Sequence, residues 1–267
     1  MKLQLFSVTL TFGDQVISNS SETGEIEQVA DQFFIHAGYN SKKALNDIAL
    51  IRLYEPVHLG PTINPACLAT DDDVLYEGRT CFIAGWGAED ERYSNGFVSD
   101  HLLEAPVPII PDSTCMHTKS YGRIFRPENH LCAGYMSGGQ NDACQNDSGG
   151  PLICIDAQNQ PILTGITSFG IGCARKNFPG VYTRITSYRE WIFSTIEEAE
   201  NSVRAEQFRE VKMESVVEAP SSDDCSSTFT KRSMDPQQSE RTLVTVRDGA
   251  LTCYGVVVYE KYVLDWW

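Results

Sequence analysis

The chain has 267 residues, which fits one large domain or one domain with an extension. Apolar residues make up 42% of it, enough for a sizeable core, so the composition argues against wholesale disorder. The formal net charge of −15 argues against a nucleic-acid partner or an anionic membrane surface, because both favour a basic face. No apolar run approaches the roughly 20 residues that cross a bilayer.

The amino-terminal segment resembles a signal peptide only superficially. Residues 1–10 carry one positive charge and a short apolar run, but no small-residue cleavage site follows them. Thr11–Asp14 instead indicates a strand that runs into a turn. We therefore predict a strand here, and the sequence as given shows no signal for export.

Short β-type runs, separated by Gly, Pro, Asn and Asp, continue to about residue 190. Many short strands without helical patterns between them predict an all-β sandwich or barrel. A helix is predicted from about Ser187, since apolar residues then follow helical spacing. The clearest β-type runs are 47–53, 80–86, 151–155, 161–167 and 180–185.

The composition changes after residue 200. Residues 200–240 are predicted to be an acidic, disordered linker, because their central part mixes Ser, Asp, Glu, Pro and Gln with few large apolar residues. Residues 241–267 regain strand character, but a segment of about 27 residues cannot build an independent core. We therefore expect a first domain at 1–199, a linker, and a short β-like tail of unknown role.

The segment Asp142–Pro151 carries the clearest chemical signal. It is a Gly-rich turn that presents Ser148 beside a cysteine and ahead of a strand. A nucleophilic serine needs such a constrained turn, with backbone N–H groups aimed at the developing oxyanion. An ordinary Asn/Asp/Ser/Gly loop is the alternative for a bare Ser-Gly-Gly sequence.

The flanking motifs favour the nucleophile, because together they resemble the trypsin/chymotrypsin-like serine endopeptidases in content and order. The resemblance runs over roughly residues 3–197 and extends to ovochymase-like egg and oviduct proteases. It implies a trypsin-like double β-barrel with a carboxyl-terminal helix, a first barrel left incomplete and an irregular tail. The motifs are Asn46–Leu50, Ala84–Gly87, Asn146–Pro151, Ser168–Gly170, Pro179–Thr183 and Trp191–Ile192.

The resemblance implies an acyl-enzyme mechanism that requires neither a cofactor nor a metal. Ser148 is then the nucleophile, Asp47 orients the general base, and the N–H groups of Asn146 and Ser148 form the oxyanion hole. Asp147 is expected to accept the α-amino group that zymogen cleavage releases. Asp47 as a solvent-exposed strand-edge carboxylate is the alternative.

The same resemblance implies cleavage after Arg or Lys. Asp142 is expected at the base of the specificity pocket, and Ala143 beside it favours Arg; Asp142 as a plain turn residue remains the alternative. The expected partners are protein or peptide substrates with Arg or Lys at the cleavage site, and protein inhibitors. The other implied substrate-binding residues are Ser168, Phe169, Gly170 and Gly180.

Two departures from the family pattern bear on activity. Asn146 stands where the family has glycine, which adds bulk at the oxyanion hole. The Ala-Ala-His-Cys motif of the general base does not occur, and none of the five histidines is expected to replace it: His36, His58, His101, His117 and His130. We therefore expect the chain as written to be inactive, and a non-catalytic homologue that acts as a binding or regulatory module is the alternative.

The nine cysteines predict a secreted, disulfide-bearing protein and leave one without a partner. The resemblance implies the pairs Cys81–Cys154, Cys115–Cys132 and Cys144–Cys173, and the tail cysteines Cys225 and Cys253 are expected to pair. Cys67 then resembles the position that tethers a propeptide, so its partner is expected in an amino-terminal part that this sequence lacks. Asn19 is the expected glycosylation site, in an Asn-Ser-Ser sequence.

Overall fold

The computed structural model describes residues 8–19, 22–70, 78–93, 98–210, 244–248, 251–259 and 262–265. The chain divides into two compact units, one formed by residues 1–190 with 241–267 and the other by 191–240. Among the described residues, no helix combines the length and the apolar character needed to span a membrane.

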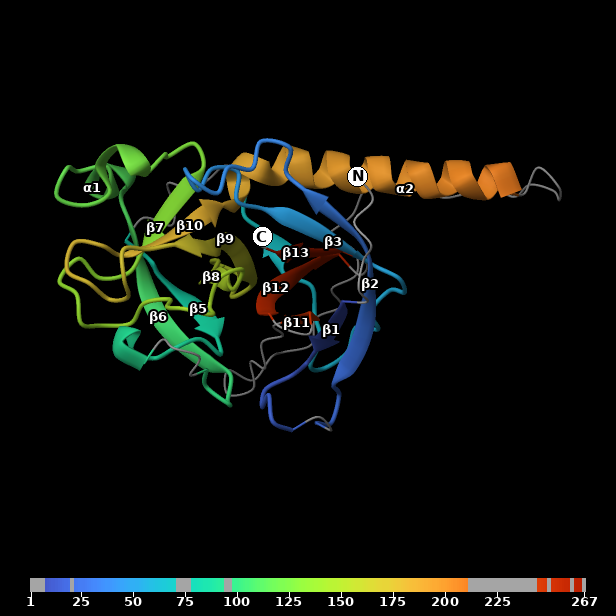
Figure 1. The fold of residues 1–267 in the computed structure, drawn as a ribbon, viewed down its shortest axis with the longest axis horizontal. Helices are drawn as coiled ribbons and strands as arrows, with labels where there is room; N and C mark the ends of the chain where they lie inside the picture. Colours follow the sequence, from blue (N-terminus) through green and yellow to red (C-terminus); the bar gives the residue numbers. More distant parts are fainter. Residues whose placement is uncertain are drawn as a thin grey trace. The chain divides into compact units, whose positions relative to one another are not determined.

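The first barrel closes with six strands drawn from the two ends of the chain. Going round it, the order is β1, β11, β12, β13, β3 and β2, and every described neighbouring pair is antiparallel. Figure 1 shows the late strands β11 to β13, in red, beside the early strands β1 and β3, in blue. The bounds are β1 Thr9–Phe12, β2 Ile26–Ile35, β3 Ala49–Leu53, β11 Val244–Asp248, β12 Leu251–Tyr259 and β13 Tyr262–Asp265.

The double-barrel prediction is confirmed, but two of its details are wrong. The first barrel is not incomplete, and the tail is not irregular, because β11 to β13 fill the gap between β1 and β3. Backbone pairing explains the difference, since strand edges hold unpaired N–H and C=O groups that another strand satisfies.

The second barrel is built from one continuous stretch of chain. Its strands follow the order β10, β7, β6, β5, β8, β9, and pairing of β10 with β9 closes the ring. Strand β4 pairs in parallel with the early part of β9, at Ile162 and Leu163. The bounds are β4 Cys67–Leu68, β5 Thr80–Gly85, β6 Leu103–Ile110, β7 His130–Ala133, β8 Pro151–Ile155, β9 Pro161–Phe169 and β10 Gly180–Arg184.

Helices are few, and the last one is longer than expected. Helix α2 runs over Arg189–Glu210, so it extends ten residues past the predicted start of the linker at 200. Residues 199–210 are rich in Ala, Glu, Gln and Arg, which favour a helix and account for the extension. The short helices are η2 Glu91–Tyr93, α1 Asp112–Cys115, η3 Gly122–Ile124 and η4 Ile185–Tyr188.

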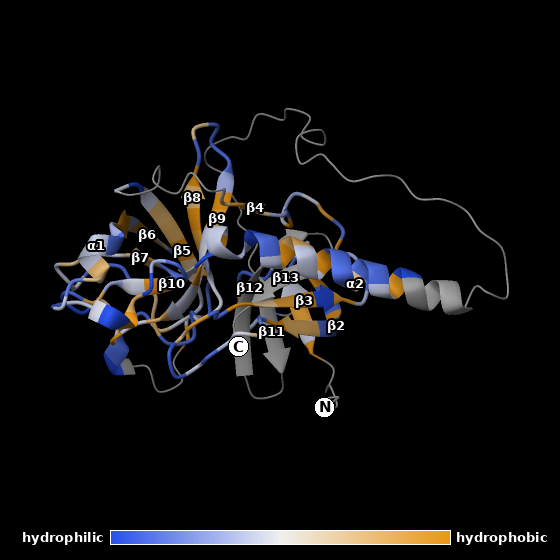
Figure 2. Cartoon of the chain, turned by 90° about the horizontal axis from the view of Figure 1, so that it is seen from above, coloured by the Kyte–Doolittle hydropathy of each residue, from blue (hydrophilic) through white to orange (hydrophobic). Residues whose placement is uncertain are grey.

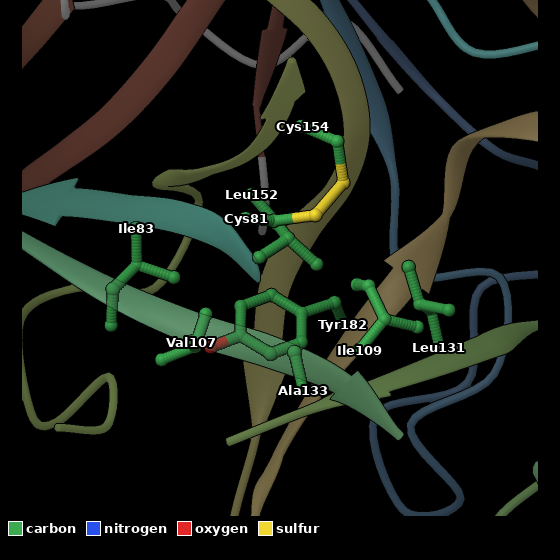
Figure 3. Close-up of a cluster of buried hydrophobic side chains, with 9 residues drawn as sticks. All are labelled: Cys81, Ile83, Val107, Ile109, Leu131, Ala133, Leu152, Cys154 and Tyr182. Atoms are coloured by element: carbon green, nitrogen blue, oxygen red, sulfur yellow. A yellow bond between two sulfur atoms is a disulfide. The ribbon is translucent and has the colours of Figure 1, made fainter. Parts of the chain in front are cut away.

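Each barrel has its own buried core. Leu10, Phe12, Ile51 and Leu53 lie in the core of the first barrel and are fully buried. In the second barrel the ring of Tyr182 lies among eight other buried residues, bordered by the Cys81–Cys154 disulfide (Figure 3). Hydrophobic residues accordingly concentrate on β5, β6, β8 and β9 (Figure 2).

The structure contains the three disulfides that the family resemblance implies: Cys81–Cys154, Cys115–Cys132 and Cys144–Cys173. All three join parts of the second barrel and its loops. The expected Cys225–Cys253 bond lies outside the described side chains. Cys67 is half-buried at the start of β4.

Candidate active site

Asp47 lies two residues before the start of β3 and is only 3% exposed. Its Oδ2 accepts a hydrogen bond of 2.5 Å from the hydroxyl of Ser168 on β9. Its backbone carbonyl accepts another, of 2.7 Å, from the hydroxyl of Thr183 on β10. Asp47 is therefore no solvent-exposed edge residue, because two strands of the second barrel hold it in a buried position.

The turn before Asp47 is fixed by side chains that the sequence pattern did not single out. Asn46 has φ of 52°, in the left-handed region that Asn tolerates better than most residues. Its Nδ2 donates to Gly38 O at 2.8 Å, and its Oδ1 accepts from Tyr188 at 3.1 Å and from Asn129 at 3.2 Å. An Asn before the carboxylate was the only available signal, because the partners lie far away in sequence.

Ser148 lies on a tight turn between the second-barrel strands and is half-buried. The turn is closed by the bond from Gly150 N to Asp147 O at 2.9 Å, and Gly149 has φ of 82°. Asn146 also has a positive φ, 72°, and its side chain is exposed. Asn146 thus adopts the left-handed backbone conformation that glycine adopts most easily.

Strand β9 brings the serine turn and the aspartate together. Gly149 N donates to Thr167 O at 3.0 Å, and Thr167 N donates to Gly150 O at 2.8 Å. The next residue on the strand, Ser168, donates to Asp47. Adjacent residues of one strand therefore hold both predicted catalytic segments.

Asp142 lies in a largely buried setting behind the serine turn. Its Oδ2 accepts a 2.7 Å hydrogen bond from Ala174 N. Burial raises the pKa of this carboxyl to about 6, although backbone N–H groups of Ala174, Ala143 and Gly180 act in the opposite direction. Among the described residues, no hydrogen-bond donor satisfies its Oδ1.

Gly180 and Tyr182 complete the surroundings of Asp142. A Cβ on Gly180 would lie 2.9 Å from Asp142 Oδ1 and 2.8 Å from the Tyr182 hydroxyl, so both oxygens face this glycine. The Tyr182 hydroxyl is buried and also has no hydrogen-bond partner within the described part of the chain. Sequence reasoning missed Tyr182, because an apolar strand pattern gives no sign that one ring ends in a polar atom at a site.

The remaining predicted substrate residues lie at the end of β9 or beside Asp142 in the sequence. Phe169 is half-buried and stacks edge-on against Tyr121, with ring centroids 5.7 Å apart. Gly170 is exposed at the end of β9. Ala143 is half-buried and packs against the core of the second barrel.

Asn19, the predicted glycosylation site, lies after β1 and is exposed, as a glycan acceptor requires.

Asp147 borders a cavity of about 790 Å³. Its carboxylate accepts 2.9 Å hydrogen bonds from Gly87 N and Cys144 N, and a Cβ on Gly85 or Gly87 would overlap it. Burial raises the pKa of Asp147 to about 6, while the two N–H donors lower it. No described cationic side chain forms an ion pair with Asp147.

The five histidines lie in different surroundings. His58, His101 and His117 are exposed. His130 is buried, and its Nε2 lies 2.7 Å from Ala44 O while its Nδ1 accepts from Arg126 N. The Nδ1 of His36 accepts from Gly38 N. Within the described residues, no imidazole is hydrogen-bonded to the Ser148 hydroxyl.

Comparisons with known proteins indicate the family of this chain. A family model described as Trypsin matches residues 5–192. The human protein named Serine protease 56 is 36% identical over 190 residues, which cover 70% of this chain and 30% of that protein. The chain therefore spans less than a third of the length of that relative.

Proposed function

Because this chain belongs to the trypsin family of serine proteases, we propose that its site is built to cleave peptide bonds after Arg or Lys through an acyl-enzyme. The Asp142 pocket sets this specificity, and Ser148 is the nucleophile. Full turnover requires an imidazole base that the five histidines do not supply. Membership of the trypsin family supports a protease-like function. The proposal adds the specificity for Arg or Lys, the roles of Ser148 and Asp142, and the absence of an imidazole base.

The unsatisfied oxygens beneath Gly180 carry the specificity proposal. A buried carboxylate without a complete set of donors is costly, and a guanidinium or ammonium offers the donors and the opposite charge. Asp142 Oδ1 and the Tyr182 hydroxyl both lack a donor among the described residues and both face Gly180. A cationic side chain that enters over this glycine meets both oxygens.

The proposed chemistry uses the serine turn in two steps. The Ser148 Oγ forms a bond to the scissile carbonyl carbon as a base takes its proton, and the amine product leaves with that proton. Water then cleaves the acyl–oxygen bond and restores the hydroxyl. The N–H groups of Ser148 and Asn146 stabilise the oxyanion in both steps, and Asp47 orients the base.

Asp147 supports a further element of the proposal. Its carboxylate lies at a cavity and has no described cationic partner, so it suits an incoming α-amino group. Pairing of that group with Asp147 would hold the Asn146–Ser148 turn in its active shape. This is the expected behaviour of a zymogen, and together with the family and the three disulfides it favours a secreted, extracellular protein.

The missing base limits the rate of acylation. In this family, loss of a triad member leaves only about 10³–10⁴-fold acceleration over water. Burst titration of the full chain with an arginine ester should therefore show no stoichiometric burst. Added imidazole should then accelerate acylation of Ser148, measured as a covalent mass increase, and S148A should not respond.

Binding of a cation tests the pocket separately from catalysis. An aryl amidine should bind the full chain, with an affinity that rises with pH through about 6 as Asp142 loses its proton. D142N should bind the amidine at least about tenfold more weakly and lose this pH dependence. Equal binding by the two proteins would contradict the proposed specificity.

The exposed side chain of Asn146 favours one alternative, a non-catalytic homologue that acts as a binding or regulatory module. Such a protein retains the pocket but not a productive oxyanion hole. Amidine binding combined with no imidazole-dependent acylation would favour this alternative. Acylation at Ser148 would exclude it.

A further inference from the structure

The first barrel is made of two strand sets that are each incomplete. Strands β1, β2 and β3 form a curved sheet whose outer members are β1 and β3. Strands β11, β12 and β13 form a second sheet whose outer members are β11 and β13. Each set alone leaves two edges of unpaired backbone groups, which is unfavourable in water and prone to aggregation.

The two sets match at both edges at once. At the first seam Thr9, Leu10, Thr11 and Phe12 are paired with Arg247, Val246, Thr245 and Val244. At the second seam Ala49, Leu50, Ile51 and Arg52 are paired with Asp265, Leu264, Val263 and Tyr262. Antiparallel register that is continuous at two separate seams is a strong constraint, because a one-residue slip would turn every side chain to the other face.

We propose that strands β11, β12 and β13 are a built-in strand donor that closes the first barrel of the same molecule. The segment is too short to bury a core by itself. The barrel in turn needs it, because the core residues Leu10 and Phe12 lie on β1, and Ile51 and Leu53 lie on β3, at the two seams. The match does not depend on the proposed protease chemistry.

The length of the connecting chain favours donation within one molecule over exchange between copies. Residues 211–243 separate helix α2 from β11. Thirty-three residues span up to about 110 Å when extended, whereas the 22 residues of α2 measure about 33 Å. Short, strained connections promote swapping, and this connection is long.

The donor segment also supports the strand that follows Asp47, the proposed triad carboxylate. The last described residue of β13, Asp265, is paired with Ala49, two residues after Asp47. The early end of β3 is thus held by β13 on one side and by β2 on the other. Closure of the barrel therefore fixes the strand whose start positions Asp47.

Engineered disulfides in the full chain test the proposal. Oxidative refolding of T9C/R247C should link the two cysteines within one molecule, because the two Cα positions are paired. T9C/V246C is the register control and should not link. A mixture of the single variants T9C and R247C can link only between copies, and we expect no such link.

The outcomes separate clearly when the linked peptides are mapped by mass spectrometry. An intramolecular T9C/R247C link with an unlinked mixture supports the proposal. A disulfide-linked dimer in the mixture would contradict donation within one molecule and would indicate strand exchange between copies. R52C/Y262C repeats the test at the second seam, and failure at both seams would overturn the proposal.

Hydrogen exchange on the unmodified chain tests the proposal without any cysteine variant, so a misfolded variant cannot affect the result. Peptides that cover 9–12, 49–53 and 244–248 should exchange at least about 100-fold more slowly than an unstructured chain. Exchange of residues 244–248 at the unstructured rate would overturn the proposal without any substitution.

Discussion

The two barrels of this molecule are assembled in contrasting ways. The second barrel comes from one continuous stretch, Cys67–Arg184, and all three described disulfides join its strands and loops. The first barrel joins two stretches separated by almost 200 residues and none of these disulfides crosses it. The residues proposed for nucleophile and specificity therefore lie on the self-contained half, whereas Asp47, the proposed triad carboxylate, lies beside the composite half.

This contrast predicts that the two barrels lose their structure separately when one of them is destabilised. Phe12 and Phe125 provide a matched pair, because each is a fully buried phenylalanine. Phe12 lies in the core of the first barrel, and Phe125 packs in a cluster with residues of the second-barrel strands β6, β7 and β10. F12A should cost about 3–5 kcal/mol of unfolding free energy through the cavity it leaves, and should remove exchange protection from β1 and β11 first. Denaturant unfolding combined with hydrogen exchange measures both effects.

F125A is the control for that comparison. It should remove protection from the second barrel while β1 and β11 remain protected. Equal loss of protection in both barrels from either variant would show that the two barrels unfold as one unit. The different assembly of the barrels would then have no effect on their stability.

Removal of the Cys144–Cys173 disulfide should weaken the self-contained half. The bond closes a loop with a sequence separation of 29, so C144A/C173A should lose about 2–4 kcal/mol of stability. Amidine binding should weaken as well, because Asp142 and Ala174 lie next to the two cysteines. Thermal unfolding with and without amidine tests this, and an unchanged melting temperature would contradict it.

The acidic residues behind the serine turn should make stability fall as pH rises. The folded-state pKa of Asp147, about 6, is higher than its ordinary value of 3.8, so the folded chain binds this proton more tightly. Stability is then lost as pH rises from about 4 to about 6, by up to about 3 kcal/mol. The stability difference between wild type and D147N should follow this slope, and a difference independent of pH would contradict the buried-carboxylate account.

Much of the second barrel was predictable from sequence, and the motifs proposed for the site were recognisable, because both depend on local residues. The Asn146–Pro151 turn depends on backbone geometry within a few residues, with a positive φ at Asn146 and at Gly149. Asp47 and Ser168 were each recognisable, but the hydrogen bond between them joins positions 121 residues apart. Only the folded chain shows that contact.

The composite barrel was not predictable for a related physical reason. The apolar and β-branched pattern of 244–258 indicates strands but does not identify the strand edge that they join. The Asn46 contacts with Asn129 and Tyr188 are likewise long-range and polar, so periodicity gives no sign of them. Long-range backbone pairing was the missing information in both cases.

Substitution of Gly180 should close the pocket at Asp142, and the side chain of Asp142 or Tyr182 must shift to accommodate the added Cβ. In G180A the added Cβ meets Asp142 Oδ1 and the Tyr182 hydroxyl, so amidine affinity should fall at least about tenfold, or 1.4 kcal/mol. G60A is a suitable control, because nothing lies within 4 Å of its Cβ position. Isothermal titration should show unchanged affinity for G60A, and equal losses for both variants would argue against a pocket at Asp142.

The smallest effect is expected at Asn146, the residue that departs most visibly from the family at the site. Its φ of 72° is tolerated by Asn but is easier for Gly, so N146G should gain a few tenths of a kcal/mol in stability. The backbone N–H is present in both proteins, and the exposed side chain lies beside it. A peptide aldehyde that forms an oxyanion adduct with Ser148 should therefore bind N146G a few-fold more tightly, while amidine binding at Asp142 stays the same. A gain for both ligands would indicate general rigidification of the 142–148 turn, and no gain for the aldehyde would show that Asn146 leaves the oxyanion hole fully accessible.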